Sequence, residues 1–295
     1  MKRLLIYIIV FFYLSLSMVT VNKSSAKDTL PKSKFSILLS NDDGYNAPGI
    51  KALAEALAPI ATLIVAAPIN EQTGASHGIT IRELVFVKQI NNPLGIQWYS
   101  ISAKPATCVH IGLEHFVDRK PDLVISGINE GENVGPLTFR SGTVGAAREA
   151  AILGLPAIAV SLQGNNKDDY KAAAVYIRQL VKNLASKKLL KSKLLLNINF
   201  PSSISKGIKG TKVTKLSLVD EKNVSHRINI PFSEIYKVKI TKPIADNDPE
   251  TDINALSNGY VTITPLSIDQ TDHAQLGLLQ DDPSVNYAAA TSSGI

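Results

Sequence analysis

The stretch Ser36-Ile37-Leu38-Leu39-Ser40-Asn41-Asp42-Asp43-Gly44-Tyr45-Asn46-Ala47-Pro48-Gly49-Ile50 indicates both the fold and the chemistry of this 295-residue chain. An apolar run leads into an acidic turn, and a helical pattern follows at once. In open α/β sheets the carboxyl ends of the strands open into the ligand crevice. Two adjacent carboxylates there repel each other and lose hydration unless a cation neutralises them. The stretch therefore predicts a cation site at Asp42 and Asp43.

Apolar runs alternate with helical patterns as far as residue 200. We expect buried strands at 37–40, 62–66, 123–126, 157–161 and 194–200, and helices at 48–57, 105–116, 143–153 and 167–186. This alternation predicts an α/β fold with a right-handed, mostly parallel sheet. We expect two further strands, at 79–87 and 97–102, to form a hairpin beside that sheet.

The pattern changes after residue 201. Period-2 segments at 212–218, 234–240 and 259–264 predict an antiparallel extension without helices, and 271–295 is expected to be a flexible tail. The expected working domain is therefore 35–270, with its core ending near residue 201.

Three further polar loops follow predicted strands. The loop 67–78 supplies the hydroxyls of Thr73 and Ser76, and the loop 126–135 supplies asparagine amides. The third, 140–148, opens a helix with Ser141 and Thr143, and a helix N-terminus is a natural phosphate seat. Oxygen ligands of these kinds favour Mg²⁺, Mn²⁺ or Ca²⁺.

Each loop alone also fits a simpler interpretation. Asn, Asp and Gly residues are common in ordinary turns, and Ser141 or Thr143 could serve only as a helix N-cap. Four such loops at one edge of one sheet favour a site. The GxxxxGK[ST], GxGxxG and HExxH patterns do not occur in the sequence, so the standard nucleotide-binding and zinc motifs are excluded.

The amino terminus has the pattern of a targeting segment. A short cationic start, an apolar run at 4–21 and the small residues Ser24-Ser25-Ala26 predict a signal peptide over 1–26, followed by a linker over 27–34. We expect cleavage after Ala26, export to the periplasm and no stable membrane span afterwards. The alternative is an uncleaved membrane anchor.

Charge and cysteine content narrow the function further. The formal charge is +6, and three of the cationic side chains lie within the first 26 residues. No block of one charge sign and no interleaving of basic with aromatic residues occurs, so nucleic-acid binding is not expected. Cys108 is the only cysteine, so the chain cannot form an internal disulfide.

Several ordered motifs resemble those of the SurE-type survival-protein phosphatases, which are metal-dependent 5′/3′-nucleotidases. The resemblance extends from residue 37 to about residue 265. It is carried by Leu38-Leu39-Ser40-Asn41-Asp42-Asp43-Gly44, Gly74-Ala75-Ser76-His77, Ser126-Gly127-Ile128-Asn129, Ser141-Gly142-Thr143-Val144 and Gly259-Tyr260-Val261-Thr262-Ile263-Thr264-Pro265.

The resemblance implies particular roles for particular residues. It implies one divalent metal ion per subunit, held by Asp42, Asp43, Thr73 and Asn129, with the two aspartates catalytic. Thr73 stands where the family usually has serine. The resemblance also implies phosphate contacts, which it assigns to Asn133, Ser141, Gly142 and Thr143.

The resemblance also implies a fold and an assembly. It implies a Rossmann-like three-layer α/β/α domain whose C-terminal antiparallel hairpin is exchanged between subunits, so that homodimers or homotetramers form. Arg140 departs from the family pattern because an aromatic residue is common there, and the Asp-Arg pair usual near Ile69-Asn70 is absent.

These observations predict a divalent-metal-dependent phosphomonoesterase. We expect it to hydrolyse nucleoside monophosphates to nucleoside and phosphate, in the manner of a 5′-nucleotidase, with 3′-nucleotides and short polyphosphate as further candidate substrates. Asp42 is the favoured proton acceptor. The alternative is an exported, non-catalytic nucleotide- or polyphosphate-binding protein with the same fold.

Overall fold

A nine-stranded sheet forms the centre of the protein in the computed structural model, which describes residues 35–219, 223–230, 233–240, 245–282 and 284–285. The strand order is β3-β4-β2-β1-β5-β6-β7-β11-β8. Six strands from β4 to β7 run parallel. They are β4 (Gln97–Ile101), β2 (Thr62–Pro68), β1 (Ser36–Ser40), β5 (Leu123–Glu130), β6 (Ala157–Leu162) and β7 (Leu195–Phe200).

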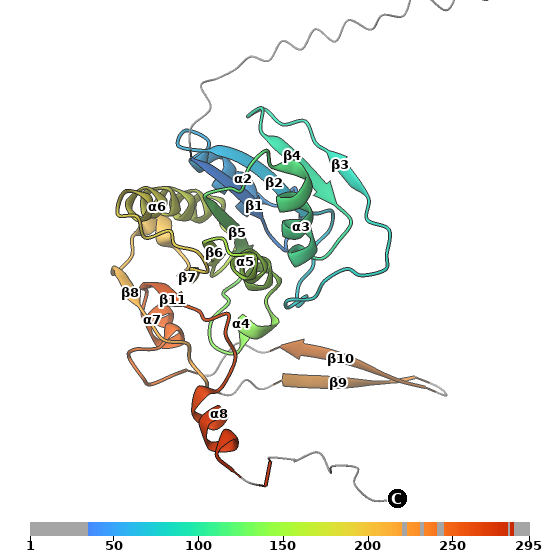
Figure 1. Ribbon diagram of the computed structural model, residues 1–295, viewed down its shortest axis with the longest axis vertical. Helices are drawn as coiled ribbons and strands as arrows, with labels where there is room; N and C mark the ends of the chain where they lie inside the picture. The colour runs from blue at the N-terminus through green and yellow to red at the C-terminus, as the bar shows by residue number, and fades with distance from the viewer. Residues whose placement is uncertain (1–34, 220–222, 231–232, 241–244, 283, 286–295) are drawn as a thin grey trace, which may run out of the picture. The chain divides into compact units, whose positions relative to one another are not determined.

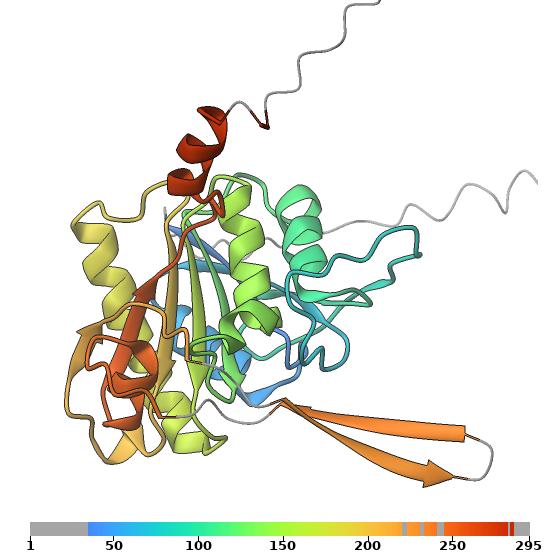
Figure 2. The ribbon, with the colours of Figure 1, turned by 90° about the horizontal axis from the view of Figure 1, so that it is seen from below.

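Helices cover both faces of this sheet, as Figures 1 and 2 show. One face packs against α2 (Pro48–Leu57) and α6 (Lys167–Ser186), and the other against α3 (Pro105–Ile111) and α5 (Gly142–Ile152). The predicted mostly parallel, three-layer α/β architecture is therefore confirmed. Within the described part of the chain, no helix combines the length and the apolarity needed to cross a membrane.

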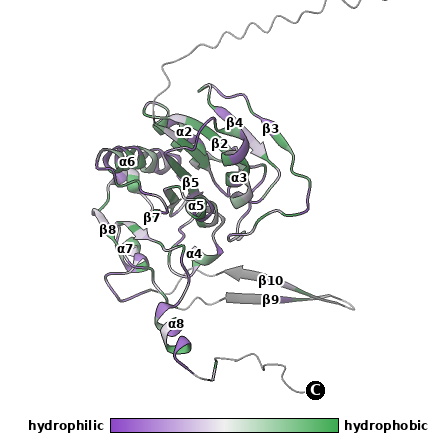
Figure 3. Ribbon diagram, in the orientation of Figure 1, coloured by the Kyte–Doolittle hydropathy of each residue, from purple (hydrophilic) through white to green (hydrophobic). Residues whose placement is uncertain are grey.

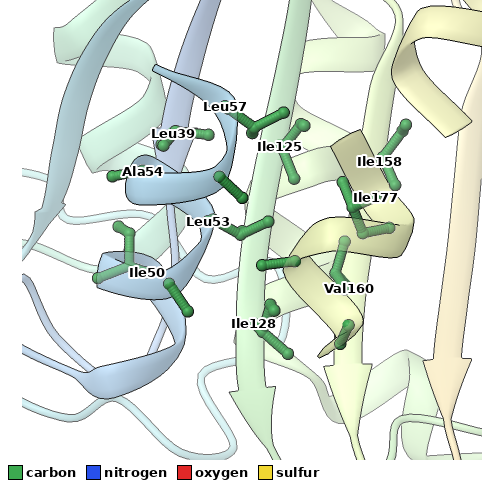
Figure 4. Close-up of a cluster of buried hydrophobic side chains, with 14 of the residues drawn as sticks. Leu39, Ile50, Leu53, Ala54, Leu57, Ile125, Ile128, Ile158, Val160 and Ile177 are labelled. Atoms are coloured by element: carbon green, nitrogen blue, oxygen red, sulfur yellow. The ribbon is translucent and has the colours of Figure 1, made fainter. Parts of the chain in front are cut away.

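The spacing of apolar residues explains how α2 packs. Pro48 presets the backbone of the first turn, and Ile50, Leu53, Ala54 and Leu57 repeat at helical spacing on one buried face. Figure 4 shows these side chains facing apolar side chains of the central strands and of α6. Burying each large aliphatic side chain contributes about 1.5–3 kcal/mol. In Figure 3, the green that marks hydrophobic residues runs along the central strands.

The strand order creates a crevice between two central strands. The chain moves from β1 to β2 and β4 on one side, and then returns to place β5 on the other side of β1. The carboxyl ends of β1 and β5 therefore lie at a topological switch point, where open α/β sheets bind ligands. Asp42 and Asp43 lie in the turn after β1, and Asn129 is the penultimate residue of β5.

Several expected elements differ from those observed. The region 79–87 is mostly loop, because only Val87–Gln89 (β3) pairs with β4. The strand expected at 97–102 is β4, which pairs parallel with β2 and so belongs to the main sheet. The short helix α4 (Leu137–Arg140) was not expected, and the helix expected at 105–116 is α3 followed by a π-turn at Gly112–Phe116.

The C-terminal region is more mixed than predicted. β11 (Val261–Pro265) pairs antiparallel with β7 and parallel with β8 (Thr211–Val213), so both strands extend the main sheet. The expectation of a helix-free region was wrong, because α7 (Asp252–Ser257) and α8 (His273–Gln280) form there.

A separate two-stranded antiparallel sheet contains β9 (Asn223–Ile230) and β10 (Ser233–Ile240). The predicted C-terminal hairpin is thus present, although its first strand was not expected. The signal peptide, the linker and the last ten residues of the expected tail lie outside the described residues.

Candidate active site at the carboxyl edge of the sheet

The acidic turn after β1 is held by hydrogen bonds within it and to the loop after β2. Asn41 donates its side-chain amide to the carbonyl of Gly44 at 2.8 Å, and the backbone N–H of Gln72 donates to the carbonyl of Asp42 at 2.7 Å. Tyr45 donates its N–H to the carbonyl of Pro68 at 2.7 Å. These contacts fix the turn against the loop that carries Thr73.

Asp42 is buried and lies against the first turn of α5. The hydroxyl of Thr143 donates to its Oδ1, and the backbone N–H of Thr143 also favours the ionised carboxylate. Burial nevertheless dominates and raises the pKa of Asp42 to about 6. The first turn of α5 is therefore arranged around a negative charge, as expected for a helix N-terminus.

Asp43 has the more strongly raised pKa of the pair. Burial and then the charge of Asp42 raise the pKa of Asp43 to about 7, although the backbone N–H of Glu130 donates to its Oδ2 at 3.2 Å. Among the described residues, neither aspartate forms an ion pair with a cationic side chain. The buried carboxylate of Asp42 and the half-buried carboxylate of Asp43 thus form an acidic pair that no cationic side chain of the described residues neutralises.

Asn129 and Thr73 place further oxygen atoms at this edge. The side-chain amide nitrogen of Asn129 donates to the carbonyls of Glu130 at 3.1 Å and Gly131 at 2.7 Å, so its Oδ1 is the atom that can face a cation. The hydroxyl of Thr73 donates to the carboxylate of Glu71, which leaves the oxygen lone pairs as acceptors.

A cleft of about 270 Å³ lies between these loops. Five of the residues implied by the sequence line it: Asp42, Thr73, Asn129, Asn133 and Ser141. Asp43, Gly142 and Thr143 adjoin it through the contacts described above. The remaining lining residues are Gly74, Glu130, Gly131, Glu132, Leu137 and Arg140.

The four residues assigned to phosphate contact also have structural partners. Ser141 caps α5, because its Oγ accepts from the N–H of Val144 at 3.1 Å. Asn133 donates its side-chain amide to Ser161 at 2.8 Å, and Thr143 is bonded to Asp42. A Cβ on Gly142 would lie 2.9 Å from Oδ2 of Asp42, so glycine allows the helix to approach that carboxylate.

A histidine–glutamate pair connects the Thr73 loop to α5. His77 Nε2 lies 2.7 Å from Oε2 of Glu149, and His110 Nδ1 lies 3.5 Å from Oε1 of the same residue. Ser76 also donates its N–H to the carbonyl of Arg140 at 3.0 Å. The loop that carries Thr73 is thereby fixed to the helix whose first turn contacts Asp42.

The sequence prediction missed the acidic side chains around the cleft and the network beneath it. Glu130 and Glu132 line the cleft, and the charge of Glu71 contributes to the raised pKa values of Asp42 and Asp43. Beneath them, Asn197 and Asn199 donate to the carbonyl of Asn133 at 2.7 and 3.2 Å. Two asparagines at alternate positions of an otherwise apolar strand were the available signal.

The donor set fits a hard divalent cation. One buried and one half-buried carboxylate, neither paired with a cationic side chain of the described residues, together with an amide oxygen and a hydroxyl, match the oxygen ligands of Mg²⁺ or Mn²⁺. Among the described residues no group of three or more His, Cys, Asp or Glu side chains is arranged to hold a metal.

The fold and the cleft define a Rossmann-like α/β protein whose cleft at the switch point carries carboxylate, amide and hydroxyl oxygens. A family model described as survival protein SurE matches residues 37–223. The solved structure of the SurE protein from Aquifex aeolicus is 34% identical, with a TM-score of 0.72, and the match covers 83% of this chain and 100% of that one. The chain belongs to the SurE family, whose members are divalent-metal-dependent phosphatases and nucleotidases.

Proposed function

We propose that this protein hydrolyses phosphate monoesters, with nucleoside monophosphates as its substrates and nucleoside and phosphate as its products. One observation carries the proposal: the unneutralised acidic pair lies directly against the first turn of α5 at one end of a 270 Å³ cleft. A cation needs negatively charged oxygen ligands, whereas a phosphate needs N–H donors at the positive end of a helix. This edge of the sheet offers both within one cleft.

The proposed ligands of the cation are Asp42, Asp43, Thr73 and Asn129. When bound, a divalent cation polarises a phosphoryl oxygen and lowers the pKa of a coordinated water. The chain's own residues then have distinct tasks. Asp42 is the proposed proton acceptor, because it lines the cleft and the hydroxyl of Thr143 fixes its orientation.

The phosphate is proposed to sit against the start of α5. Ser141 and the backbone around Gly142 and Thr143 would hold the charge that develops on the phosphoryl oxygens, because helix N-termini favour anions. Arg140 lines the same cleft and adds positive charge. Asn133, which hydrogen bonds with Ser161 and Asn199 hold in place, would also contact the phosphate.

The test is phosphate release from a panel of 5′- and 3′-nucleoside monophosphates with Mg²⁺ or Mn²⁺, repeated after EDTA. We expect metal-dependent release that Asp42→Ala lowers by at least about 10³-fold, whereas Asp281→Asn, an exposed aspartate in the C-terminal region, has no effect. Tight nucleotide binding without metal-dependent release would instead identify a non-catalytic binding protein and refute the proposal.

We also propose that residues 1–26 direct export and are removed after Ala26, which would place the enzyme in the periplasm. The proposal rests on the cationic start, the apolar run and the small residues of that segment. Cell fractionation and sequencing of the mature amino terminus test it. Recovery of the intact segment in the membrane fraction would favour the anchored alternative.

A further inference from the structure

Two glutamates on the wall of the cleft have no role in the proposed ligand set. Glu130 and Glu132 both line the cleft and flank Gly131 in the turn after Asn129. Each is held by an amide side chain from the loop after β6. Asn165 donates to Oε1 of Glu130 at 3.0 Å, and Gln163 donates to Oε1 of Glu132 at 3.5 Å. The two carboxylates are therefore oriented from outside the turn.

Glu130 and Glu132 form an acidic rim of the cleft, and the charge of Glu130 acts on Asp43. The backbone N–H of Glu130 donates to Oδ2 of Asp43 at 3.2 Å, and the charges of Glu130 and Glu71 both contribute to the raised pKa of Asp43. A divalent cation would balance Asp42 and Asp43. The cleft lining would then keep the carboxylates of Glu130 and Glu132, and among the described lining residues Arg140 is the one cationic side chain.

A rim of this kind discriminates between classes of phosphate compound. A carboxylate accepts hydrogen bonds from hydroxyl groups, and acidic residues at switch points bind ribose hydroxyls in other Rossmann-like folds. The same carboxylates repel any additional phosphate group that enters the cleft. A substrate with one phosphate and a neutral, hydroxyl-bearing leaving group suits both conditions, whereas a polyanion suits neither.

We infer that Glu130 and Glu132 determine specificity: they select monophosphates of hydroxyl-bearing leaving groups and exclude nucleoside triphosphates and polyphosphate. This inference rests on the proposed phosphomonoesterase function. It narrows that function, because short polyphosphate, one of the candidates from the sequence, is then a poor substrate.

The experiment compares kcat/KM for adenosine 5′-monophosphate with that for tripolyphosphate, in the full chain with Mn²⁺. The variants are Glu130→Gln, Glu132→Gln and both together, since glutamine keeps a hydrogen-bond acceptor and loses the charge. We expect the monophosphate preference to fall about 5- to 20-fold in the double variant. Glu55→Gln, an exposed glutamate on α2, is the matched control and should leave the preference unchanged.

Salt dependence separates charge selection from a change in packing. Repulsion between the rim and a polyanion weakens at high ionic strength, so the wild-type preference should decline with added salt and that of the double variant should stay nearly constant. A second arm uses the 2′,3′-dideoxy analogue, which lacks the hydroxyl donors. We expect its kcat/KM to lie below that of the ribonucleotide by about tenfold.

The outcomes distinguish failure of this inference from failure of the proposed phosphomonoesterase function. Absence of metal-dependent release from every substrate refutes the phosphomonoesterase itself. If monophosphates are hydrolysed and the glutamine variants leave the preference unchanged, or if the wild type prefers tripolyphosphate, the function stands and the selective role of Glu130 and Glu132 is overturned.

Discussion

At the scale of single residues, the energetics of the site are concentrated in Asp42 and Asp43. Asp42 is buried and Asp43 is half-buried, and the described residues provide hydrogen bonds to both carboxylates but no ion pair. Such a pair lowers the stability of the folded chain whenever it is ionised and unliganded. The same feature gives the site its affinity for a cation.

This pair makes the stability of the metal-free protein depend on pH. The pKa values of Asp42 (about 6) and Asp43 (about 7) lie above the value of about 3.9 in an unfolded chain, so the folded state binds more protons between pH 4 and 7. Stability in EDTA should therefore fall as pH rises through this window, by on the order of 3 kcal/mol. Urea unfolding at pH 5 and pH 8 measures the change.

Two further measurements control for other titrating groups. The double variant Asp42→Asn with Asp43→Asn should show a smaller loss of stability between pH 5 and pH 8. Saturating Mn²⁺ at pH 8 should restore stability to the wild type and not to that variant. Equal pH dependence in both proteins would contradict the prediction.

A second prediction at this scale concerns the hydroxyl of Thr73. Thr73→Val keeps the shape of the side chain and removes the oxygen, whereas Thr73→Ser keeps the oxygen. We expect the valine variant to weaken Mn²⁺ binding by roughly tenfold and the serine variant to bind as the wild type does. Isothermal titration calorimetry measures both affinities, and equal affinity in all three proteins would remove Thr73 from the ligand set.

At the scale of elements, the site depends on how closely α2 approaches β5. A Cβ on Gly49 would lie 1.9 Å from the backbone oxygen of Ile128, the residue before Asn129. Only glycine allows the helix to pack there, because backbone atoms on both sides cannot move independently. The position of Asn129 is thus linked to that of the helix after the acidic turn.

Gly49→Ala should therefore lower both stability and metal affinity. We expect the free energy of unfolding to fall by about 2 kcal/mol or more, since overpacking against backbone forces the elements apart. Urea unfolding measures the loss. The control is Gly277→Ala in α8, where a Cβ would meet nothing within 4 Å, and it should be neutral or stabilising by up to about 1 kcal/mol.

The contact between the Thr73 loop and α5 gives another prediction. His77 lowers the pKa of Glu149, which marks an interaction that favours the ionised carboxylate. Glu149→Gln should weaken it, destabilise the protein by about 1 kcal/mol and lower Mn²⁺ affinity through the displaced loop. Unfolding and metal titrations on one preparation test this, and unchanged metal affinity would show that the contact is structural only.

At the scale of the whole molecule, the hairpin of β9 and β10 suggests self-association. Ile228 and Ile235 pair across the two strands and are each 46% exposed, and Tyr236 is 54% exposed. A two-stranded hairpin is marginally stable on its own in water. Exposed apolar side chains on such a hairpin are typical of a surface that another chain covers. The homodimer or homotetramer expected from the sequence remains a prediction.

Light scattering after size-exclusion chromatography tests that prediction. We expect the wild type to be a dimer or tetramer, and Ile228→Ser with Ile235→Ser to shift it toward monomer while circular dichroism stays unchanged. Val213→Ser on β8, an apolar position outside the hairpin that is still more exposed, is the control. A monomeric wild type, or an unchanged assembly in the double variant, would contradict it.

Local pattern was sufficient for much of the fold. The limits of α2 and α6 match the predicted helices residue for residue, because apolar spacing, Pro48 and the cap at Asn166 are all local signals. The prediction failed where local signals are weak. The segment 79–87 alternates like a strand, yet only its last residue, Val87, pairs with another strand, and α7 depends on the tertiary contacts of Asp252.

Sequence by itself therefore determined the alternating α/β pattern, the acidic turn at Asp42 and Asp43 and the polar loops that follow the strands. Tertiary structure alone decided that Thr143 contacts Asp42 from 101 residues away and that Asn165 and Gln163 orient the glutamates of the cleft. The reason is physical. Periodicity records which face of an element is buried, whereas the order of strands in the sheet decides which distant loops share one edge.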